Sequence, residues 1–195
     1  ALARDIRLQD HPVLRSHVID GRAVLPLALH LEWLAHAALH GNPGLRFHAF
    51  EDFRVLKGVR LENSRTSDLK IMASKAARRG ELFEVAMELR GPLELRHAVV
   101  KVLLAERLPQ SQTAILPEPV LRPYSRARND AYRDFLFHGE LLQGIRSIIG
   151  IADDMIALDV ELAPPPKAWM KSPLRDTWLC DPLALDCLFQ GMILW

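Results

Sequence analysis

The sequence is poor in cysteine, in long apolar runs and in net charge, and each scarcity excludes a class of protein. Cys180 and Cys187 are its 2 cysteines, and their spacing fits neither a disulfide framework nor a zinc site. With 25 basic and 24 acidic residues the formal charge is only +1, so no bulk field attracts nucleic acid or an anionic membrane. No secretory signal, membrane-spanning run or glycine-rich phosphate loop occurs. We therefore expect a cytoplasmic globular protein that binds no nucleic acid, membrane or metal.

The two ends of the chain indicate a piece of something larger. The sequence begins with ALARDIRL, without an initiator methionine, and it stops inside the apolar stretch GMILW. An apolar helix pattern is a poor natural terminus because nothing in the sequence covers or caps it. We expect an excised domain whose last lobe is incomplete.

The first half of the chain predicts one helix followed by a run of strands. Residues 12–20 are rich in β-forming side chains, and Pro26 suits the first turn of a helix. Apolar residues then recur at helical spacing up to the turn HGNPG at 40–44. The predicted strands, separated by turn-rich segments, are FRVLKGVRL, DLKIMASKA, LFEVAMELR and LELRHAVVKVLLAE. This order is typical of a curved antiparallel sheet wrapped around a central helix.

The second half repeats that order in outline after a proline-rich segment. LPQSQTAILPEPVLRP resembles an extended linker, MIALDVELA alternates as a strand does, and DPLALDCLFQGMILW predicts a second helix. We therefore predict an α+β protein with a first lobe at 1–107, a linker at 108–123 and a partial second lobe at 124–195.

Asp186 is the polar residue that the second helix explains least. Asp181 suits an N-cap because Pro182 follows it, but Asp186 lies in a segment that is apolar nearly all round, as in a buried helix. A buried carboxylate must be paired, hydrogen-bonded or protonated, and Gln190 lies one turn further on the same face. Burial raises the pKa of an aspartate, which would make it a proton donor near neutral pH. A purely structural role is equally compatible with this pattern.

His17 is distinguished from the other histidines by its spacing. A lone histidine near a core is more often a packing residue, and we interpret seven in that way: His11, His30, His36, His40, His48, His97 and His138. His17, however, precedes Gly21 by four residues and Pro26 by nine. By composition this arrangement is expected only about 0.03 times in such a chain.

Three stretches together resemble one known family. HVIDGRAVLP, with His17, Gly21 and Pro26, resembles the His-x3-Gly-x4-Pro motif of polyketide synthase dehydratase domains. LDCLFQ, with Asp186 and Gln190, resembles their Asp-x3-Gln/His motif. The motifs lie in the order expected for this family. Related domains occur in iterative polyketide synthases and in polyunsaturated fatty acid synthases.

The third stretch, LFHGELLQGI, resembles the Tyr/His-Gly-Pro-x-Phe-Gln motif that opens the second lobe of those domains. Gly139 and Gln143 match the motif, whereas Glu140 and Leu142 replace its proline and phenylalanine. HPVL at 11–14 and LEW at 31–33 also fit the first lobe of the family.

The resemblance implies a double hotdog fold and the dehydration of a β-hydroxyacyl thioester. His17 would be the base that removes the α proton, and Asp186, oriented by Gln190, the acid that protonates the leaving hydroxyl. Gly21 would permit close approach of the backbone, and N–H groups near Leu25 would favour the thioester oxygen. The implied partners are an acyl carrier protein with its phosphopantetheine and the neighbouring synthase domains. Homodimers are common in such domains, and no further cofactor is implied.

Two other functions remain compatible with the same residues. A non-catalytic dehydratase-like module would bind the carrier protein or organise a synthase without turnover. A hotdog thioesterase or product-shaping domain would use the same pocket for hydrolysis or cyclisation. Release of a free thiol, in place of an enoyl product, would distinguish the thioesterase.

Overall fold

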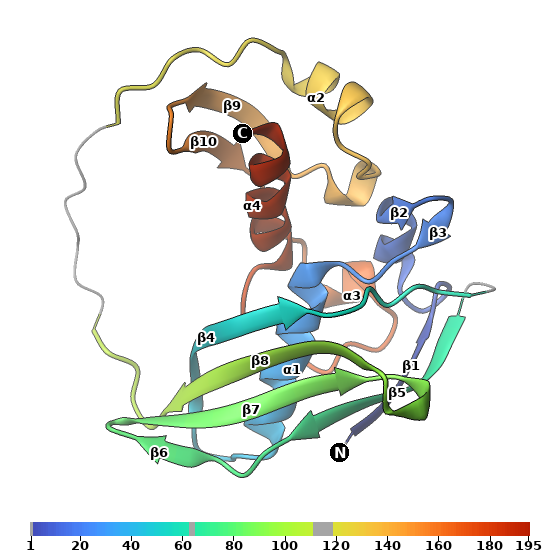
Figure 1. Ribbon diagram of the computed structural model, residues 1–195, viewed down its shortest axis with the longest axis vertical. Helices are drawn as coiled ribbons and strands as arrows, with labels where there is room; N and C mark the ends of the chain where they lie inside the picture. Colours follow the sequence, from blue (N-terminus) through green and yellow to red (C-terminus); the bar gives the residue numbers. More distant parts are fainter. Residues whose placement is uncertain (1, 63–64, 111–118) are drawn as a thin grey trace.

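A six-stranded antiparallel sheet dominates the first half of the chain in the computed structural model, which describes residues 2–62, 65–110 and 119–195 (Figure 1). Its strands are β1 (Leu2–Arg7), β4 (Arg46–Val55), β5 (Arg65–Ala73), β6 (Ala77–Arg79), β7 (Leu82–Arg90) and β8 (Arg96–Ala105). The strand order is β1-β5-β7-β8-β4, and β6 pairs with β7. The predicted mixture of helices with an antiparallel sheet is confirmed.

The boundaries of the first and fourth strands differ from the prediction. The strand β1 was not predicted, and β4 begins at Arg46, whereas the sequence pattern places a strand at 53–61. β4 is an edge strand whose pairing with β8 shifts register between Glu51 and Arg54, where Asp52 has a positive φ of 53°. This irregularity interrupts the apolar alternation by which a strand is identified in a sequence.

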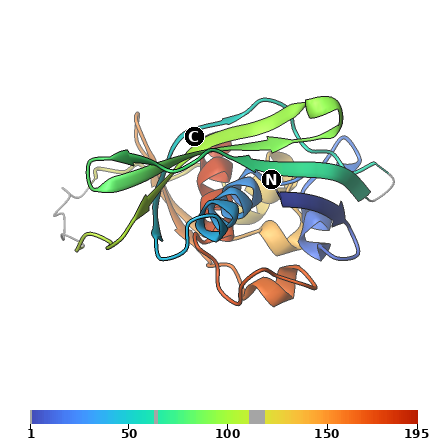
Figure 2. The same ribbon diagram turned by 90° about the horizontal axis from the view of Figure 1, so that it is seen from below.

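The helix α1 (Leu27–His40) packs against one face of this sheet (Figure 2). The pattern predicted a single apolar stripe, but every residue from Ala28 to Leu39 is buried. The sheet covers one side of α1. The helix α4, which belongs to the second half of the chain, also contacts α1. Pro26 stands one residue before the helix, as its N-cap, and its carbonyl accepts from the N–H groups of Leu29 and His30.

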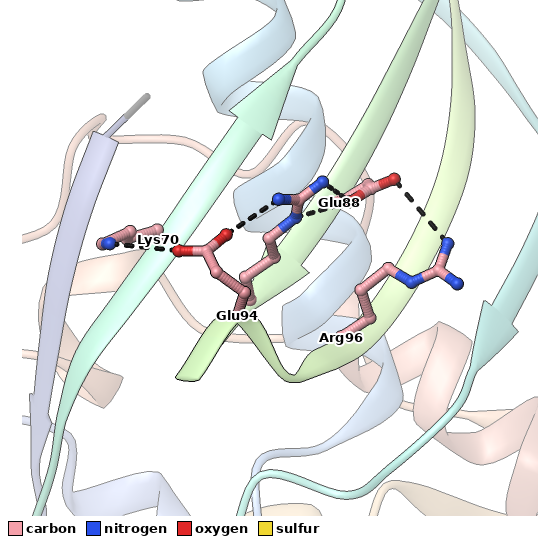
Figure 3. A network of polar contacts seen from close by, with 5 residues as sticks. Lys70, Glu88, Glu94 and Arg96 are labelled. Carbon is pink, nitrogen blue, oxygen red and sulfur yellow. Dashed lines mark hydrogen bonds and ion pairs between the residues drawn. The ribbon is translucent and has the colours of Figure 1, made fainter. Parts of the chain in front are cut away.

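A polar network covers part of the same sheet away from α1 (Figure 3). Arg90 donates to Glu88 and Glu94, Lys70 pairs with Glu94 at 3.2 Å, and Arg96 reaches Glu88 at 4.0 Å. These side chains are partly or largely exposed to solvent, so each pair contributes little to stability. These charged side chains make this face of the sheet polar, whereas the opposite face packs on α1.

The second half of the chain contains a smaller sheet and the second long helix. The elements are α2 (Arg128–Asp134), the 3-10 turn η3 (Glu140–Leu142), β9 (Ile145–Ile151), β10 (Ile156–Val160), α3 (Pro166–Trp169) and α4 (Pro182–Leu194). β9 and β10 form a two-stranded sheet, and α4 contacts β10 and α1. Asp181 caps α4 as predicted, by accepting from the N–H groups of Leu183 and Ala184.

The prediction that α4 is buried all round is wrong for the described structure. Leu188 and Met192 are 63% and 69% exposed, and Ile193 is half-exposed. The described elements that pack on α4 lie on one side of it, which leaves this apolar face uncovered.

Short elements complete the first half of the chain. The 3-10 turn η1 (Pro12–Ser16) precedes a small hairpin of β2 (Val18–Ile19) and β3 (Arg22–Ala23), where the sequence predicted a simple β segment, and η2 (Pro92–Glu94) joins β7 to β8. Half of the predicted linker, residues 111–118, lies outside the described residues. Its described end pairs with β9 through Arg122 and Ile151. No helix in the described parts of the chain is long and apolar enough to span a membrane.

Candidate active site

The hairpin of β2 and β3 positions His17. The backbone N–H of Val24 donates to the carbonyl of His17 at 2.9 Å, and Nδ1 of the His17 ring lies 2.9 Å from the carbonyl of Val24. A carbonyl only accepts, so Nδ1 carries the proton, and the neutral ring keeps a free lone pair on Nε2. Burial lowers the pKa of His17 from 6.5, against the opposing effect of the Val24 hydrogen bond. His17 is therefore a neutral, oriented base at neutral pH.

Gly21 serves the turn of this hairpin. Asp20 and Gly21 have φ values of 52° and 73°, the conformation that two-residue hairpin turns require and that glycine adopts most easily. A Cβ on Gly21 would meet no atom within 4 Å. The turn conformation is therefore the reason within the described chain for a glycine here, and close approach of this backbone to a substrate stays a prediction.

The predicted donor at Leu25 is already occupied. Its N–H donates to the carbonyl of Val59 at 2.9 Å, so it cannot also bind a thioester oxygen. Pro26 has no N–H, and the N–H groups of Leu29 and His30 donate to the carbonyl of Pro26. The first turn of α1 thus offers an incoming oxygen the N–H groups of Leu27 and Ala28, which have no acceptor inside the helix.

Asp186 is buried on α4 and held by a chain of hydrogen bonds. Gln190 donates from Nε2 to Oδ2 of Asp186 and to the carbonyl of Leu142, both at 2.8 Å. Tyr132 donates to Oε1 of Gln190 at 2.8 Å and accepts from the N–H of Ile145. This fixes the Gln190 amide, as the one-turn spacing from Asp186 predicted. Burial raises the pKa of Asp186 to about 6, although the Gln190 hydrogen bond opposes the rise.

His138 lies beside Asp186, although its sequence context predicted a packing residue. Its Nε2 is 3.3 Å from Oδ2 of Asp186, and both side chains are only 4% exposed. Its Nδ1 is buried and has no hydrogen-bond partner among the described residues. Burial, and secondarily the nearby His17, lowers the pKa of His138 to about 4. The available signal was its position directly before Gly139, where the resembling motif has tyrosine or histidine.

The two histidines and Asp186 converge from the two halves of the chain. One ring nitrogen of each histidine and one carboxylate oxygen of Asp186 all lie within 4.8 Å of one another. His17 and His138 are paired through their backbones, and their ring centroids are 5.5 Å apart. The ring of Phe137, 43% exposed, stacks on His138 at 4.2 Å and meets the edge of His17 at 5.0 Å. Phe137 therefore separates both imidazoles from part of the solvent.

Gly139 and Gln143 support this arrangement from the backbone. The N–H of Gly139 donates to the carbonyl of Ser16 at 2.8 Å, and Leu141 donates to the Ser16 hydroxyl at 3.1 Å. A Cβ on Gly139 would lie 2.9 Å from Cα of Ser16, so only glycine fits here without a shift. Gln143 donates to the carbonyl of His138 at 3.1 Å. Both predicted residues thus position His138 beside His17.

A buried carboxylate on α1 joins the two long helices. Glu32, 1% exposed, accepts from the N–H groups of Leu179 and Cys180 at 2.8 and 3.0 Å, directly before α4. His36, one turn along α1, lies 3.0 Å from the same carboxylate. These contacts fix the start of α4, and hence Asp186, relative to α1.

The chemistry available at the site is that of an acid and a base. The three converging groups are also of the kinds that ligate transition metals. The expectation that the site uses no metal or other cofactor stays a prediction.

Comparison with known proteins shows which proteins share this fold. No protein-family model matches the chain. A polyunsaturated fatty acid synthase polypeptide of Thraustochytrium sp. is 27% identical over 197 residues, which cover 100% of this chain and 7% of that polypeptide. The dehydratase domain of the CurF module of curacin polyketide synthase superposes with a TM-score of 0.71 at 18% identity, covering 97% of this chain and 68% of the other. The chain has the fold of polyketide synthase dehydratase domains.

Two further dehydratase domains agree with this fold. The CurK domain of curacin polyketide synthase gives a TM-score of 0.68 at 16% identity, over 96% of this chain and 65% of that one. PpsC from Mycobacterium tuberculosis gives 0.63 at 17%, over 97% and 67%. The resemblance noted in the sequence is therefore confirmed, and the chain spans about two thirds of these dehydratase domains.

Proposed function

We propose that this chain dehydrates a β-hydroxyacyl thioester carried on an acyl carrier protein, giving the α,β-enoyl thioester within a polyketide or polyunsaturated fatty acid synthase. The observation that carries the proposal is the meeting of His17 and Asp186, with pKa values shifted in opposite directions. A buried imidazole kept neutral is a base, and a buried carboxyl group that keeps its proton longer is an acid. Elimination of water needs one of each.

The reaction uses each group once. Nε2 of His17 removes the proton from the α carbon, and negative charge develops on the thioester oxygen. The N–H groups of Leu27 and Ala28, at the positive end of α1, stabilise that charge. The electron pair then forms the Cα–Cβ double bond as the Cβ–O bond breaks, and Asp186 gives its proton to the departing hydroxyl, which leaves as water. Transfer of the acquired proton from His17 to Asp186 restores the starting state.

Gln190 and His138 act through Asp186. Both contact Oδ2, and each holds the carboxyl group in one orientation. In support of a histidine in this chemistry, a His-to-Phe variant of the CurK dehydratase domain is described as an inactive mutant.

We further propose the larger setting of the chain. Its two halves form a double hotdog, with lobes at 1–107 and 124–195 joined by 108–123, and α4 is the central helix of the second lobe. The exposed apolar face of α4 supports this because a hotdog helix is wrapped by a sheet. The partners are the carrier protein, neighbouring synthase domains and a second copy of the chain, in the cytoplasm. The substrate's phosphopantetheine is the only prosthetic group involved.

The decisive experiment follows 3-hydroxybutyryl-pantetheine with the parent chain and with His17→Ala and Asp186→Asn. Conversion to the enoyl thioester is measured by mass spectrometry, and free thiol by a thiol reagent. Each substitution should reduce turnover at least about 100-fold, the range for general acid–base groups. His40→Ala, at an exposed histidine on α1, is the matched control and should retain full activity.

Three outcomes distinguish the alternatives. Undiminished dehydration in either variant, with circular dichroism unchanged, would refute the assignment of the acid and base. Thiol release without enoyl product would indicate a thioesterase. Binding of carrier protein with no turnover of any thioester by the parent chain would indicate a non-catalytic module.

A further inference from the structure

A positively charged cleft of about 600 Å³ opens beside the hairpin that carries His17. Arg22, Lys57, Arg60, Glu62 and His97 supply its polar lining. Arg22 pairs with Glu62 at 3.0 Å, which cancels one positive charge. Lys57 and Arg60 form no ion pair with any described residue, so the cleft keeps an excess of two positive charges in a chain whose formal charge is +1. Such a concentration of charge favours an anionic ligand.

The backbone around the cleft is fixed by hydrogen bonds. The N–H of Lys57 donates to the carbonyl of His97 at 3.1 Å, and the ring of His97 donates from Nδ1 to the carbonyl of Lys57 at 2.9 Å. The backbones of Arg60 and Val24 form an antiparallel β-bridge. On either side of it, the N–H groups of Leu25 and Leu61 donate to carbonyl groups of the opposite segment. Lys57 and Arg60 are therefore presented from an ordered backbone.

The cleft is close to the candidate active site. Val24, which lines the cleft, is also the residue whose carbonyl accepts from the ring of His17. The backbone of His17 is hydrogen-bonded to that of Val24, and Val24 is paired with Arg60. Two such steps place the backbone of Arg60 about 10 Å from that of His17, at the usual spacing of paired strands. An anion bound here would lie within reach of a flexible chain whose other end is at His17.

We propose that Lys57 and Arg60 bind the phosphodiester of the phosphopantetheine arm that presents the acyl group. This inference rests on the proposed function, because it assumes a thioester at His17. About thirteen bonds separate the phosphorus of the arm from its sulfur, which gives an extended length of about 15 Å at peptide-like bond lengths. The arm therefore spans the interval between the cleft and His17. Two cations and a phosphodiester form charge-assisted hydrogen bonds, the strong class in proteins.

The test compares pantetheine with phosphopantetheine, which differ only in the phosphate. Titration calorimetry on the whole chain should show phosphopantetheine binding at least tenfold more tightly than pantetheine, and the advantage should decline with salt. The double variant Lys57→Ala/Arg60→Ala should lose that tenfold difference. Lys75→Ala is the matched control: this exposed lysine lies just before β6, at the end of the sheet far from β2 and β3 (Figure 1), and its loss should preserve the difference.

A kinetic measurement with the 3-hydroxybutyryl esters separates this inference from the proposed function. The double variant should lose at least tenfold in kcat/KM for the phosphopantetheine ester and less than twofold for the pantetheine ester. Equal losses for both esters, or no loss for either, would overturn the role of the cleft while leaving dehydration intact. If the parent chain turns over neither ester, the proposed function fails and the calorimetry still decides the binding site. Inorganic phosphate binding as tightly as phosphopantetheine would overturn the assignment to the arm.

Discussion

Asp186 and His138 contact each other in the interior of the molecule, with Oδ2 of the carboxylate 3.3 Å from Nε2 of the imidazole. Burial raises the pKa of Asp186 to about 6 and lowers that of His138 to about 4, so both groups favour their uncharged forms. A neutral imidazole has one donor and one acceptor. It can therefore accept from the protonated carboxyl group and, as the other tautomer, donate to the carboxylate. This makes His138 suited to hold Asp186 in both protonation states.

Replacement of His138 tests this positioning role. His138→Phe preserves an aromatic ring beside Phe137 but removes the nitrogen that faces Asp186, and we expect kcat to fall about tenfold, the equivalent of one hydrogen bond. His138→Gln keeps a donor and an acceptor and should recover part of the loss. Steady-state kinetics on both variants checks the expectation, and KM should stay unchanged. A His138→Phe protein with the parent kcat would show that Gln190 alone orients Asp186.

The pH dependence of turnover should have a limb on each side. Asp186 must be protonated, so kcat/KM should decline as the pH rises above about 6. His17 must be neutral, so kcat/KM should also decline on acidification, with a midpoint below 6.5. Gln190→Leu removes the donor that favours the charged carboxylate, and the alkaline limb should move to higher pH. A profile of kcat/KM from pH 4 to 9 measures both limbs, and an alkaline limb that stays in place in Gln190→Leu would contradict the assignment to Asp186.

The same shift makes Asp186 a cost to stability at neutral pH. Its pKa is 3.8 when unperturbed and about 6 in the fold, so the folded state holds the proton more tightly. Stability from this group is fully present below pH 3.8 and is lost as the pH rises through 6, by about 3 kcal/mol in all. Asp186→Asn should therefore unfold at higher urea concentration than the parent at pH 7, with the difference vanishing near pH 4. A variant less stable than the parent at pH 7 would contradict the raised pKa.

The local signals in the sequence explain which parts of the fold could be predicted. LFEVAMELR alternates regularly and coincides with β7, and the Asp181-Pro182 pair marks the start of α4 because both preferences depend only on neighbouring residues. The burial of α1 and α4 depended on what packs around them. Glu32 and His36 are polar residues on α1, yet both are buried: the segment before α4 binds the Glu32 carboxylate, and His36 contacts that carboxylate.

Parts of the candidate site could be predicted where the interval between two residues in the sequence determines their contact. The one-turn interval between Asp186 and Gln190 predicted their contact, since residues four apart share a helix face. His138 was missed although the motif has tyrosine or histidine at its position, because its contact with Asp186 depends on a long-range backbone pairing with His17 that the sequence pattern does not show. Of the N–H groups predicted near Leu25, that of Leu25 itself is not available, because Val59, far along the chain, supplies its acceptor.

Gly139 lies where the second half of the chain contacts the first, at Ser16 beside the site. An added Cβ would lie 2.9 Å from Cα of Ser16, and backbone atoms cannot rotate away as a side chain does. Gly139→Ala should therefore lower the free energy of unfolding by about 1–3 kcal/mol and reduce turnover, because the shift moves His138 away from His17. Gly41→Ala is the matched control: its φ of −79° is ordinary for alanine, and the added Cβ would lie 3.7 Å from its nearest neighbour. Urea unfolding and turnover of both variants decide the point, since equal effects at the two glycines would show that the contact with Ser16 does not align the histidines.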